Sequence, residues 1–239
     1  MSIMNDEKYL NVTYSDEKNP RTTYPQMLGR EIVKRTNVSS GDFLDLGCGR
    51  GEYLDVFADL GFDVTGFDLT THMVKGDHKT VVIDLEVDGL PEEHVGRYDI
   101  VFTKSVIEHM NNPMELIDSA YKALKPDGVM VSMTPAWEYT YWGPFYCDHT
   151  HVTPWTKQSL GEALLMTGFD DIHVEHFFQL PFLWRCPQLR PLVKLFRKLP
   201  LPYTPNYDSP LPVSHWLNKF IRFSKELMLF SIARKPDVN

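Results

Sequence analysis

The chain has 239 residues, a hydrophobic content of 43% and a formal net charge of −8, which fits one large α/β domain with an insertion. No run of 18 apolar residues is present, so a membrane-spanning helix is excluded. The acidic surface would repel a phosphate backbone, and we expect no nucleic-acid partner. The three cysteines are too few and too scattered for a disulfide framework or a zinc site. The opening residues resemble no secretory signal, so we expect a cytoplasmic protein.

The first regular elements lead to a glycine-rich turn. Residues 1–22 are polar and are expected to be loose, whereas the apolar pattern over 24–35 predicts a helix. A short apolar strand then ends in the turn 45–51, Asp-Leu-Gly-Cys-Gly-Arg-Gly, and a second amphipathic helix follows. Glycines at alternate positions allow backbone N–H groups to approach a ligand that a Cβ would exclude. The pattern therefore predicts a ligand where this strand meets the helix.

The next two predicted strands each end in an aspartate. Residues 62–67 lead into Asp68, which lies about 20 residues after Gly47, the spacing at which a carboxylate can accept both ribose hydroxyls of a nucleoside. Residues 80–83 lead into Asp84, whose carboxylate can accept from an exocyclic amino group while Leu85 packs on a purine. The structural alternative is that both aspartates only cap their loops.

Taken together, these residues resemble the class I S-adenosylmethionine-dependent methyltransferases, from about residue 40 to 135 and again near the C-terminus. The D-x-G-x-G-x-G turn is specific in that setting, and a dinucleotide G-x-G-x-x-G would place its third glycine on Glu52. The resemblance implies S-adenosylmethionine as cofactor, with its methionine part at the turn, its ribose at Asp68 and its adenine at Asp84 and Leu85. The implied cofactor-binding residues are Asp45, Gly47, Cys48, Gly49, Asp68, Leu69, Asp84, Leu85 and Lys104. Cys48 is expected to pack rather than to react.

The remaining pattern continues the alternation of strands and helices. Further elements are expected as a strand at 98–103, a helix at 113–124, a turn at 125–128, a strand at 129–133, a helix at 156–167 ended by Gly168, and strands at 172–178 and 225–234. The resemblance implies a doubly wound, seven-stranded, Rossmann-like methyltransferase fold whose last strand is antiparallel. About 45 residues separate the last two strands where a tight turn would suffice, so we expect a functional insertion there. We call residues 181–222 the lid insertion and expect helices around 188–198 and 213–223.

The run after the fifth strand carries the best catalytic candidates. Residues 136–156 are aromatic and histidine-rich, and in the resembled fold they border the methyl donor. For a hydroxyl acceptor a general base is useful, and histidine suits neutral pH. Asp148, His149 and His151 can supply a base with an orienting carboxylate. Alternatively, the histidines close the loop onto the next helix or bind a metal, although without a third ligand at a defined spacing we predict no metal.

Two short stretches carry further resemblances. The stretch from His151 to Trp155 resembles the H-V-x-P-[FW] stretch of bacterial methyltransferases associated with glycan clusters. Glu108 and His109 resemble the end of the E-x-x-E-H segment by which quinone-biosynthesis O-methyltransferases bind a divalent metal, but Ser105 replaces the first glutamate. His109 is the second candidate base, and Glu108 otherwise caps a helix or pairs with Lys104.

Acceptor contacts are expected from the aromatic run and from the lid insertion. Six aromatics within residues 137–146, including Tyr139, Tyr141 and Trp142, suit the face of a sugar or another ring. The lid insertion has seven Lys or Arg against one acid. It can be a solvated face, it can bind an anionic acceptor through Arg185 and Arg190, or it can contact a membrane surface through its interleaved apolar residues.

The interpretation that combines these patterns is methyl transfer from S-adenosylmethionine to an acceptor hydroxyl. We favour a saccharide or glycan intermediate, which can be anionic or lipid-linked, with peripheral contact to the inner membrane face through the lid insertion. The enzymatic alternative is O-methylation of a small aromatic, quinone-like or carboxylate metabolite. The non-enzymatic alternative is a donor-binding partner subunit.

Overall fold

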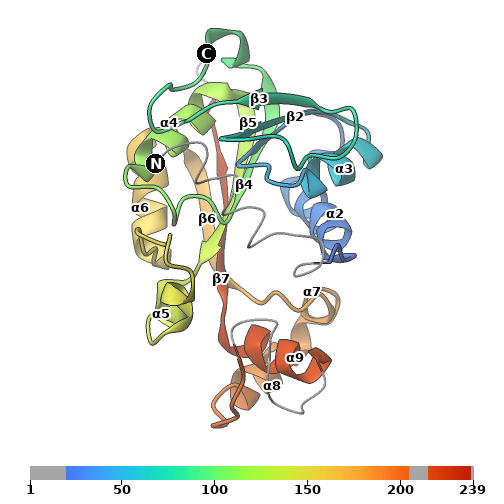
Figure 1. Ribbon diagram of the computed structural model, residues 1–239, viewed down its shortest axis with the longest axis vertical. Helices are drawn as coiled ribbons and strands as arrows, with labels where there is room; N and C mark the ends of the chain where they lie inside the picture. The colour runs from blue at the N-terminus through green and yellow to red at the C-terminus, as the bar shows by residue number, and fades with distance from the viewer. Residues whose placement is uncertain (1–19, 205–214, 238–239) are drawn as a thin grey trace.

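The computed structural model describes residues 20–204 and 215–237, and a seven-stranded sheet runs through them (Figure 1). The strand order is β3-β2-β1-β4-β5-β7-β6. The strands are β1 (Gly41–Leu46), β2 (Phe62–Asp68), β3 (Lys79–Val82), β4 (Tyr98–Lys104), β5 (Leu124–Pro135), β6 (Asp170–Phe177) and β7 (Met228–Arg234). Only β7 runs antiparallel to its neighbours, β5 and β6. The predicted doubly wound fold with a reversed last strand is confirmed.

Helices cover both faces of the sheet (Figure 1). On one face α2 (Tyr24–Thr36) packs on α3 (Glu52–Asp59), and on the other α4 (Pro113–Ala123) packs on α6 (Lys157–Thr167). The central strands are therefore buried on both sides and read as almost continuous apolar runs. The helix α6 starts at a capping box between Thr156 and Ser159 and ends at Gly168, whose φ of 107° confirms the predicted C-terminal glycine.

Stacked aromatic rings fix α3 against the centre of the sheet. The ring of Phe43 on β1 lies 3.7 Å from that of Phe57 on α3 and 6.2 Å from that of Phe102 on β4, centroid to centroid. All three side chains are buried. Because the glycine-rich turn connects β1 to α3, this packing also fixes the geometry of the turn.

Several predicted boundaries are wrong. β5 starts at Leu124, which pairs with Tyr98 on β4. The predicted turn 125–128 therefore lies within β5, at an irregularity in the pairing of β4 with β5. β7 starts at Met228 rather than at residue 225, because α9 (His215–Lys225) continues to that residue. An ion pair between Arg222 and Glu226, 2.8 Å apart, holds the end of this helix.

The segments beyond β5 and β6 contain only short helices. The run after β5 forms α5 (Trp137–Thr140) and the 3₁₀ helix η2 (Pro144–Cys147). The lid insertion forms α7 (Phe182–Arg185), η3 (Pro187–Leu189), α8 (Arg190–Phe196) and most of α9, which lie together at one end of the molecule (Figure 1). Helices were expected near α8 and α9, but residues 213 and 214, like the segment 1–19 that was expected to be loose, lie outside the described residues. Among the described helices none has the length and apolarity needed to cross a bilayer.

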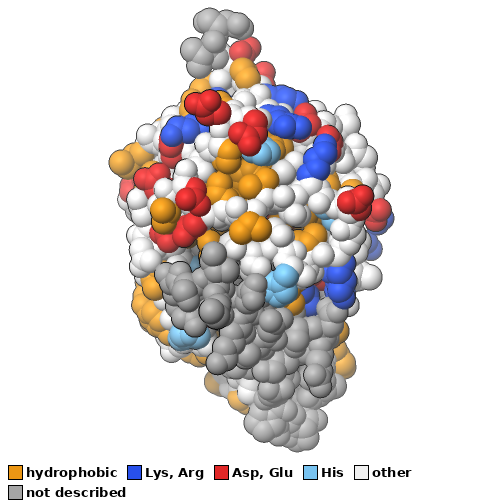
Figure 2. Space-filling view, turned by 45° about the horizontal axis from the view of Figure 1, so that its top comes forward, with side chains coloured by type: hydrophobic (Ala, Val, Ile, Leu, Met, Phe, Trp, Pro, Cys, Tyr) orange, Lys and Arg blue, Asp and Glu red, His pale blue; other side chains and the backbone are white. Residues whose placement is uncertain are grey.

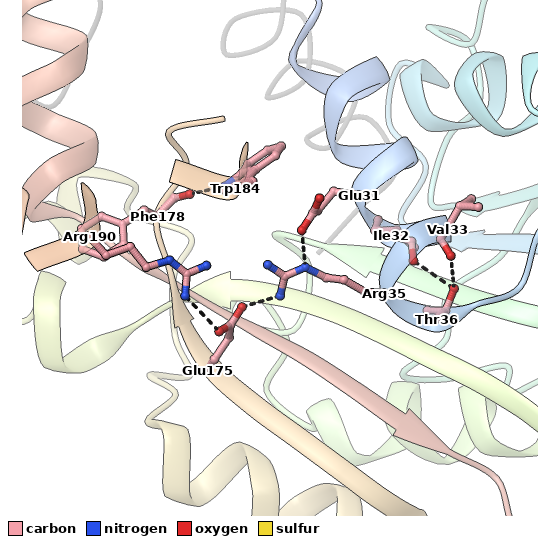
Figure 3. A network of polar contacts seen from close by, with 9 residues as sticks. All are labelled: Glu31, Ile32, Val33, Arg35, Thr36, Glu175, Phe178, Trp184 and Arg190. Carbon is pink, nitrogen blue, oxygen red and sulfur yellow. Dashed lines mark hydrogen bonds and ion pairs between the residues drawn. The ribbon is translucent and has the colours of Figure 1, made fainter. Parts of the chain in front are cut away.

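A network of charged side chains joins the lid insertion to the core. The carboxylate of Glu175 on β6 lies between the guanidinium groups of Arg35 on α2 and Arg190 on α8 (Figure 3). Arg35 also donates a hydrogen bond to Glu31 one helical turn earlier. The side chains of this network are half-buried, so solvent screens their attraction only in part.

Candidate functional site

The glycine-rich turn is shaped by three residues with positive φ. Gly47, Gly49 and Gly51 have φ values of 80°, 51° and 72°. A Cβ at Gly47 would lie 2.3 Å from Val106 Cγ2, and one at Gly51 would lie 2.9 Å from Val74 Cγ1. A Cβ at Gly49 would meet nothing within 4 Å. Gly47 and Gly51 thus permit close packing of the chain, whereas Gly49 borders open space in which a ligand can lie.

The predicted ribose-binding carboxylate is tied to this turn. Asp68 accepts hydrogen bonds from the backbone N–H of Gly49, at 2.8 Å, and of Thr70, at 3.3 Å. Asp84 accepts from the backbone N–H of Glu86 at 3.0 Å. The adjacent Leu85 is buried and Leu69 is exposed. Both aspartates therefore cap their loops, as the structural alternative predicted, and these caps also fix the carboxylates at the edge of the sheet where a nucleoside is expected.

A buried carboxylate lies at the end of β1. Asp45 is buried, and its Oδ2 has no hydrogen-bond partner among the described residues. Burial raises the pKa of Asp45 to about 8; the nearby Asp68 carboxylate raises it further and the Lys104 ammonium lowers it. Burial also lowers the pKa of Lys104, against the attraction of Glu108, Glu52 and Asp45. A buried carboxyl with an oxygen that lacks a hydrogen-bond partner suits a cationic group of a ligand.

Cys48 packs inside the turn rather than facing the open space. Its side chain is buried, and a Cβ added to Gly66 on β2 would lie 2.8 Å from its Sγ. Burial raises the pKa of the thiol, with the Asp45 and Asp68 carboxylates adding to the shift. The thiol therefore stays protonated at neutral pH, which agrees with the packing role expected for it.

Two histidines from different segments lie side by side beyond the turn. His109 follows β4, His151 follows η2, and their ring centroids are 4.6 Å apart. His109 belongs to the segment whose Val106 packs on Gly47, which places the pair near the glycine-rich turn. The sequence singled out each histidine separately, but nothing in the sequence placed them together.

Hydrogen bonds assign the tautomer of both rings. His151 Nδ1 donates to the backbone oxygen of Phe145 at 2.6 Å, since a carbonyl can only accept. Thr150 Oγ1 donates to the Asp148 carboxylate at 2.6 Å. Because the Thr150 hydroxyl has donated its hydrogen to Asp148, Thr150 Oγ1 accepts from His109 Nδ1 at 2.8 Å. In both neutral rings Nε2 consequently carries the lone pair.

The local environment keeps both rings neutral. Burial lowers the pKa of His109 to about 4, and the neighbouring His151 lowers it further while Asp148 opposes the shift. Burial likewise lowers the pKa of His151, again against Asp148. Asp148 is thus linked through Thr150 to His109 rather than by a direct hydrogen bond to His151, with which the sequence grouped it. His149 is exposed, so of the two loop histidines His151 has the more enclosed position.

Glu108 completes a cluster that can hold a divalent cation. Its side chain is 0% exposed, its Oε2 accepts from Thr134 Oγ1 at 2.9 Å, and its Oε1 has no partner among the described residues. Burial raises the pKa of Glu108 to about 7. One ligand atom each from Glu108, His109 and His151 lie within 4.8 Å of one another. A carboxylate and two imidazoles suit several divalent metals, so the structure supplies the third ligand that the sequence did not.

The predicted acceptor contacts separate into two groups. Tyr139 lies under the guanidinium of Arg197, which is 4.4 Å from its ring centroid, whereas Tyr141 and Trp142 are exposed. Trp142 contacts the ring of Tyr203 edge-on at 5.9 Å.

The two arginines predicted to bind the acceptor have different surroundings. Arg190 faces Glu175, 4.0 Å away (Figure 3). Arg185 is exposed. Arg197, which was not predicted, is therefore the lid arginine that contacts the aromatic run.

Comparison with known proteins supports the reading of this site. Residues 21–174, more than half of the chain, match the family described as "Methyltransferase domain". Over 101 residues the chain is 34% identical to a ubiquinone biosynthesis O-methyltransferase from Psychrobacter arcticus, a match that covers 38% of this chain and 39% of that protein. The chain thus matches less than half the length of this curated relative. That name gives no support to the glycan association inferred from residues 151–155.

Solved structures agree with the fold. A methyltransferase dependent on S-adenosylmethionine (SAM) from Archaeoglobus fulgidus has a TM-score of 0.59 and 22% identity, covering 88% of this chain and 94% of that one. Phosphoethanolamine N-methyltransferase 2 from Haemonchus contortus, solved with S-adenosyl-L-methionine, has a TM-score of 0.63 and 18% identity, covering 99% of this chain and 60% of that one. The open space at Gly49 and the buried Asp45 carboxyl, whose Oδ2 has no hydrogen-bond partner among the described residues, fit a ligand with a cationic group such as that donor. The chain belongs to the family described as "Methyltransferase domain".

Proposed function

We propose that this protein transfers the methyl group of S-adenosylmethionine to an acidic hydroxyl, with His151 or His109 as the general base. The observation that carries the proposal is the pair of neutral imidazoles whose Nδ1 atoms are engaged and whose Nε2 atoms carry lone pairs. Such fixed tautomers are typical of bases that accept a proton at one defined atom.

The residues of the chain would divide the work between binding and proton transfer. When bound, the cofactor supplies an electrophilic methyl group on a sulfonium. Gly49 would leave room for it, Asp68 and Asp84 would bind its nucleoside, and Asp45 would face its cationic end. Imidazole Nε2 of His151 or His109 would take the proton of the acceptor hydroxyl. Holding the acceptor in a reactive orientation would supply most of the acceleration.

The low basicity of the histidines selects among acceptors. A base whose conjugate acid has a pKa of about 4, as in His109, takes a proton poorly from an alkyl hydroxyl, whose acidity is near that of water, about 15.7. A phenolic hydroxyl, with a pKa of about 10, is a much better partner. This argument and the name of the curated relative favour a small aromatic or quinone-like acceptor over the saccharide expected from the sequence.

A saccharide acceptor remains the second candidate because of one observation. Tyr141 and Trp142 are both exposed on the run that carries His151, and flat aromatic faces suit sugar rings. For this candidate His151, on the same run as the two aromatic side chains, would be the base.

Purified protein incubated with S-adenosylmethionine and separate panels of polyhydroxylated phenols and of sugars tests the proposal. We expect S-adenosylhomocysteine, measured by mass spectrometry, to accumulate with the phenols. Turnover with sugars alone would overturn the acceptor class. Cofactor binding by calorimetry without turnover on either panel would favour a donor-binding partner subunit.

A further inference from the structure

The lid insertion exposes a stripe of leucines. Leu189, Leu192, Leu195 and Leu199 are 36%, 64%, 66% and 49% exposed. Their spacing of three, three and four residues places them on one face of a helix, along η3, α8 and the turn that follows. Val193, on the other side of α8, is buried in the core. The helix is thus apolar toward solvent as well as toward the protein.

Cationic side chains surround this stripe. Between Glu175 and Asp208 the sequence has no acidic residue and five Lys or Arg. Two of the five point to partners on the protein: Arg190 lies beside Glu175 (Figure 3) and Arg197 lies over Tyr139. Arg185, Lys194 and Lys198 are exposed. Within the described residues 176–204 the leucine stripe is therefore accompanied in the sequence by basic residues and by no acidic one, in a chain whose net charge is −8.

In two other regions of the surface, exposed apolar residues lie among different charged side chains. On the face drawn in Figure 2, acidic and basic side chains are interspersed around a small group of hydrophobic ones. On α6 the exposed pair Leu165 and Met166 lies near Glu162, with no lysine or arginine between residues 158 and 169. Exposed apolar residues thus also occur on α6, where the surrounding sequence lacks the run of lysine and arginine found in the lid insertion.

We propose that the leucine stripe of the lid insertion, with the basic residues between 185 and 198, docks on an anionic membrane surface. The leucines would enter the acyl region while the flexible lysines reach anionic headgroups. Trp216 on the neighbouring α9 is 69% exposed, and tryptophan favours the membrane interface. A flat bilayer suits this surface because the lid helices lie at one end of the long axis of the molecule (Figure 1). An acidic protein partner is the competing occupant.

Docking would bring the run after β5, residues 136–156, close to the bilayer. Arg197 and Tyr203 of the lid insertion contact Tyr139 and Trp142, respectively, on the run that carries His151. An apolar acceptor could then pass from the lipid to the site without crossing water. The membrane proposal is argued from the leucine stripe and not from the proposed function, so each can be wrong without affecting the other.

Sedimentation of the full chain with vesicles tests the proposal. We expect binding to vesicles of phosphatidylglycerol and phosphatidylcholine, about tenfold less to phosphatidylcholine alone, and weaker binding at high salt. The double variant Leu192→Ser/Leu195→Ser should bind at least tenfold less, and Lys194→Gln/Lys198→Gln should lose the preference for the anionic lipid. The matched control is Leu165→Ser/Met166→Ser, whose side chains are 65% and 82% exposed and whose replacement should change nothing.

Folding and activity are followed in the same variants. Unchanged cofactor binding and unchanged turnover of a water-soluble phenol would show that the leucine variants are folded. Absence of vesicle binding by the unaltered protein, or equal loss in the α6 control, would overturn the proposal. If the unaltered protein is a dimer that the leucine variants dissociate, and vesicles do not bind it, the stripe is a protein interface and the membrane proposal fails.

Discussion

The donor and acceptor halves of this site are built from different parts of the chain. In the donor half, backbone conformation determines the geometry. Three glycines have positive φ, and backbone N–H groups donate to the carboxylates of Asp68 and Asp84. In the acceptor half, side chains from separate segments support one another, as with Thr150 between Asp148 and His109. The donor half therefore depends on its glycines and on the few carboxylates that its backbone fixes, whereas the acceptor half depends on contacts between side chains of separate segments.

The largest expected effect comes from removing a base in the acceptor half. His151→Ala should lower turnover about 10²–10⁴-fold, because the proton then has no acceptor in line with the reacting oxygen. Cofactor affinity by calorimetry should stay unchanged, since the ring is not part of the donor half. His149→Ala is the matched control, because this exposed neighbour lies on the same loop and should retain turnover.

Two results would redirect this assignment. Turnover near the wild-type value in both His151→Ala and His109→Ala would place the base elsewhere. Loss of activity on chelation, restored by a divalent cation, would make Glu108, His109 and His151 metal ligands, contrary to the metal-free site expected from the sequence.

Two glycines of the donor half should respond differently to the same substitution. Gly47→Ala combines a left-handed φ with a contact of 2.3 Å to Val106 and should destabilise the fold by about 2–5 kcal/mol. Gly49→Ala meets no atom of the chain within 4 Å and should cost about 1–2 kcal/mol from backbone strain alone, yet weaken cofactor binding tenfold or more. Urea denaturation and calorimetry measure the two quantities. Unchanged cofactor affinity in Gly49→Ala would show that the ligand does not approach this residue.

The same contrast explains what could be predicted from the sequence. The glycine turn, Asp68 and Asp84 are local patterns, because each lies where a strand ends and the chain order of strands fixes their neighbours. The contact between His109 and His151 depends on how the run after β5 folds back onto the segment after β4, where the Val152 and Thr153 amides donate to the Glu108 carbonyl. No hydrophobic periodicity in the sequence predicts that this run folds back onto the segment after β4. The contact between Arg190 on α8 and Glu175 on β6 could not be predicted for the same reason, since it joins elements that are separate in the sequence.

A smaller effect is expected at the ribose carboxylate. Asp68→Ala should weaken cofactor binding by about 1–3 kcal/mol, because a buried ribose loses its acceptor. Part of the loss would come through the turn, whose Gly49 amide donates to this carboxylate. Asp63→Ala on the same strand removes only an exposed ion pair with Lys79 and should leave affinity unchanged. Equal affinities in the two variants would contradict the ribose assignment.

The smallest expected effect is a pH dependence of the cofactor-free protein that depends on Asp45. Its folded pKa, about 8, lies above the value of about 3.9 for an unfolded aspartate. The stability that the protonated carboxyl contributes is therefore complete below about pH 4 and is lost as the pH rises through 8. Between pH 6 and 9 the melting temperature should fall more steeply in the wild type than in Asp45→Asn, with about 2–4 °C corresponding to each kcal/mol. Saturating cofactor should reduce this difference in pH dependence between the wild type and Asp45→Asn, because its cationic end stabilises the ionised carboxylate. If the melting temperature of the wild type depends on pH in the same way with and without cofactor, Asp45 does not face that group.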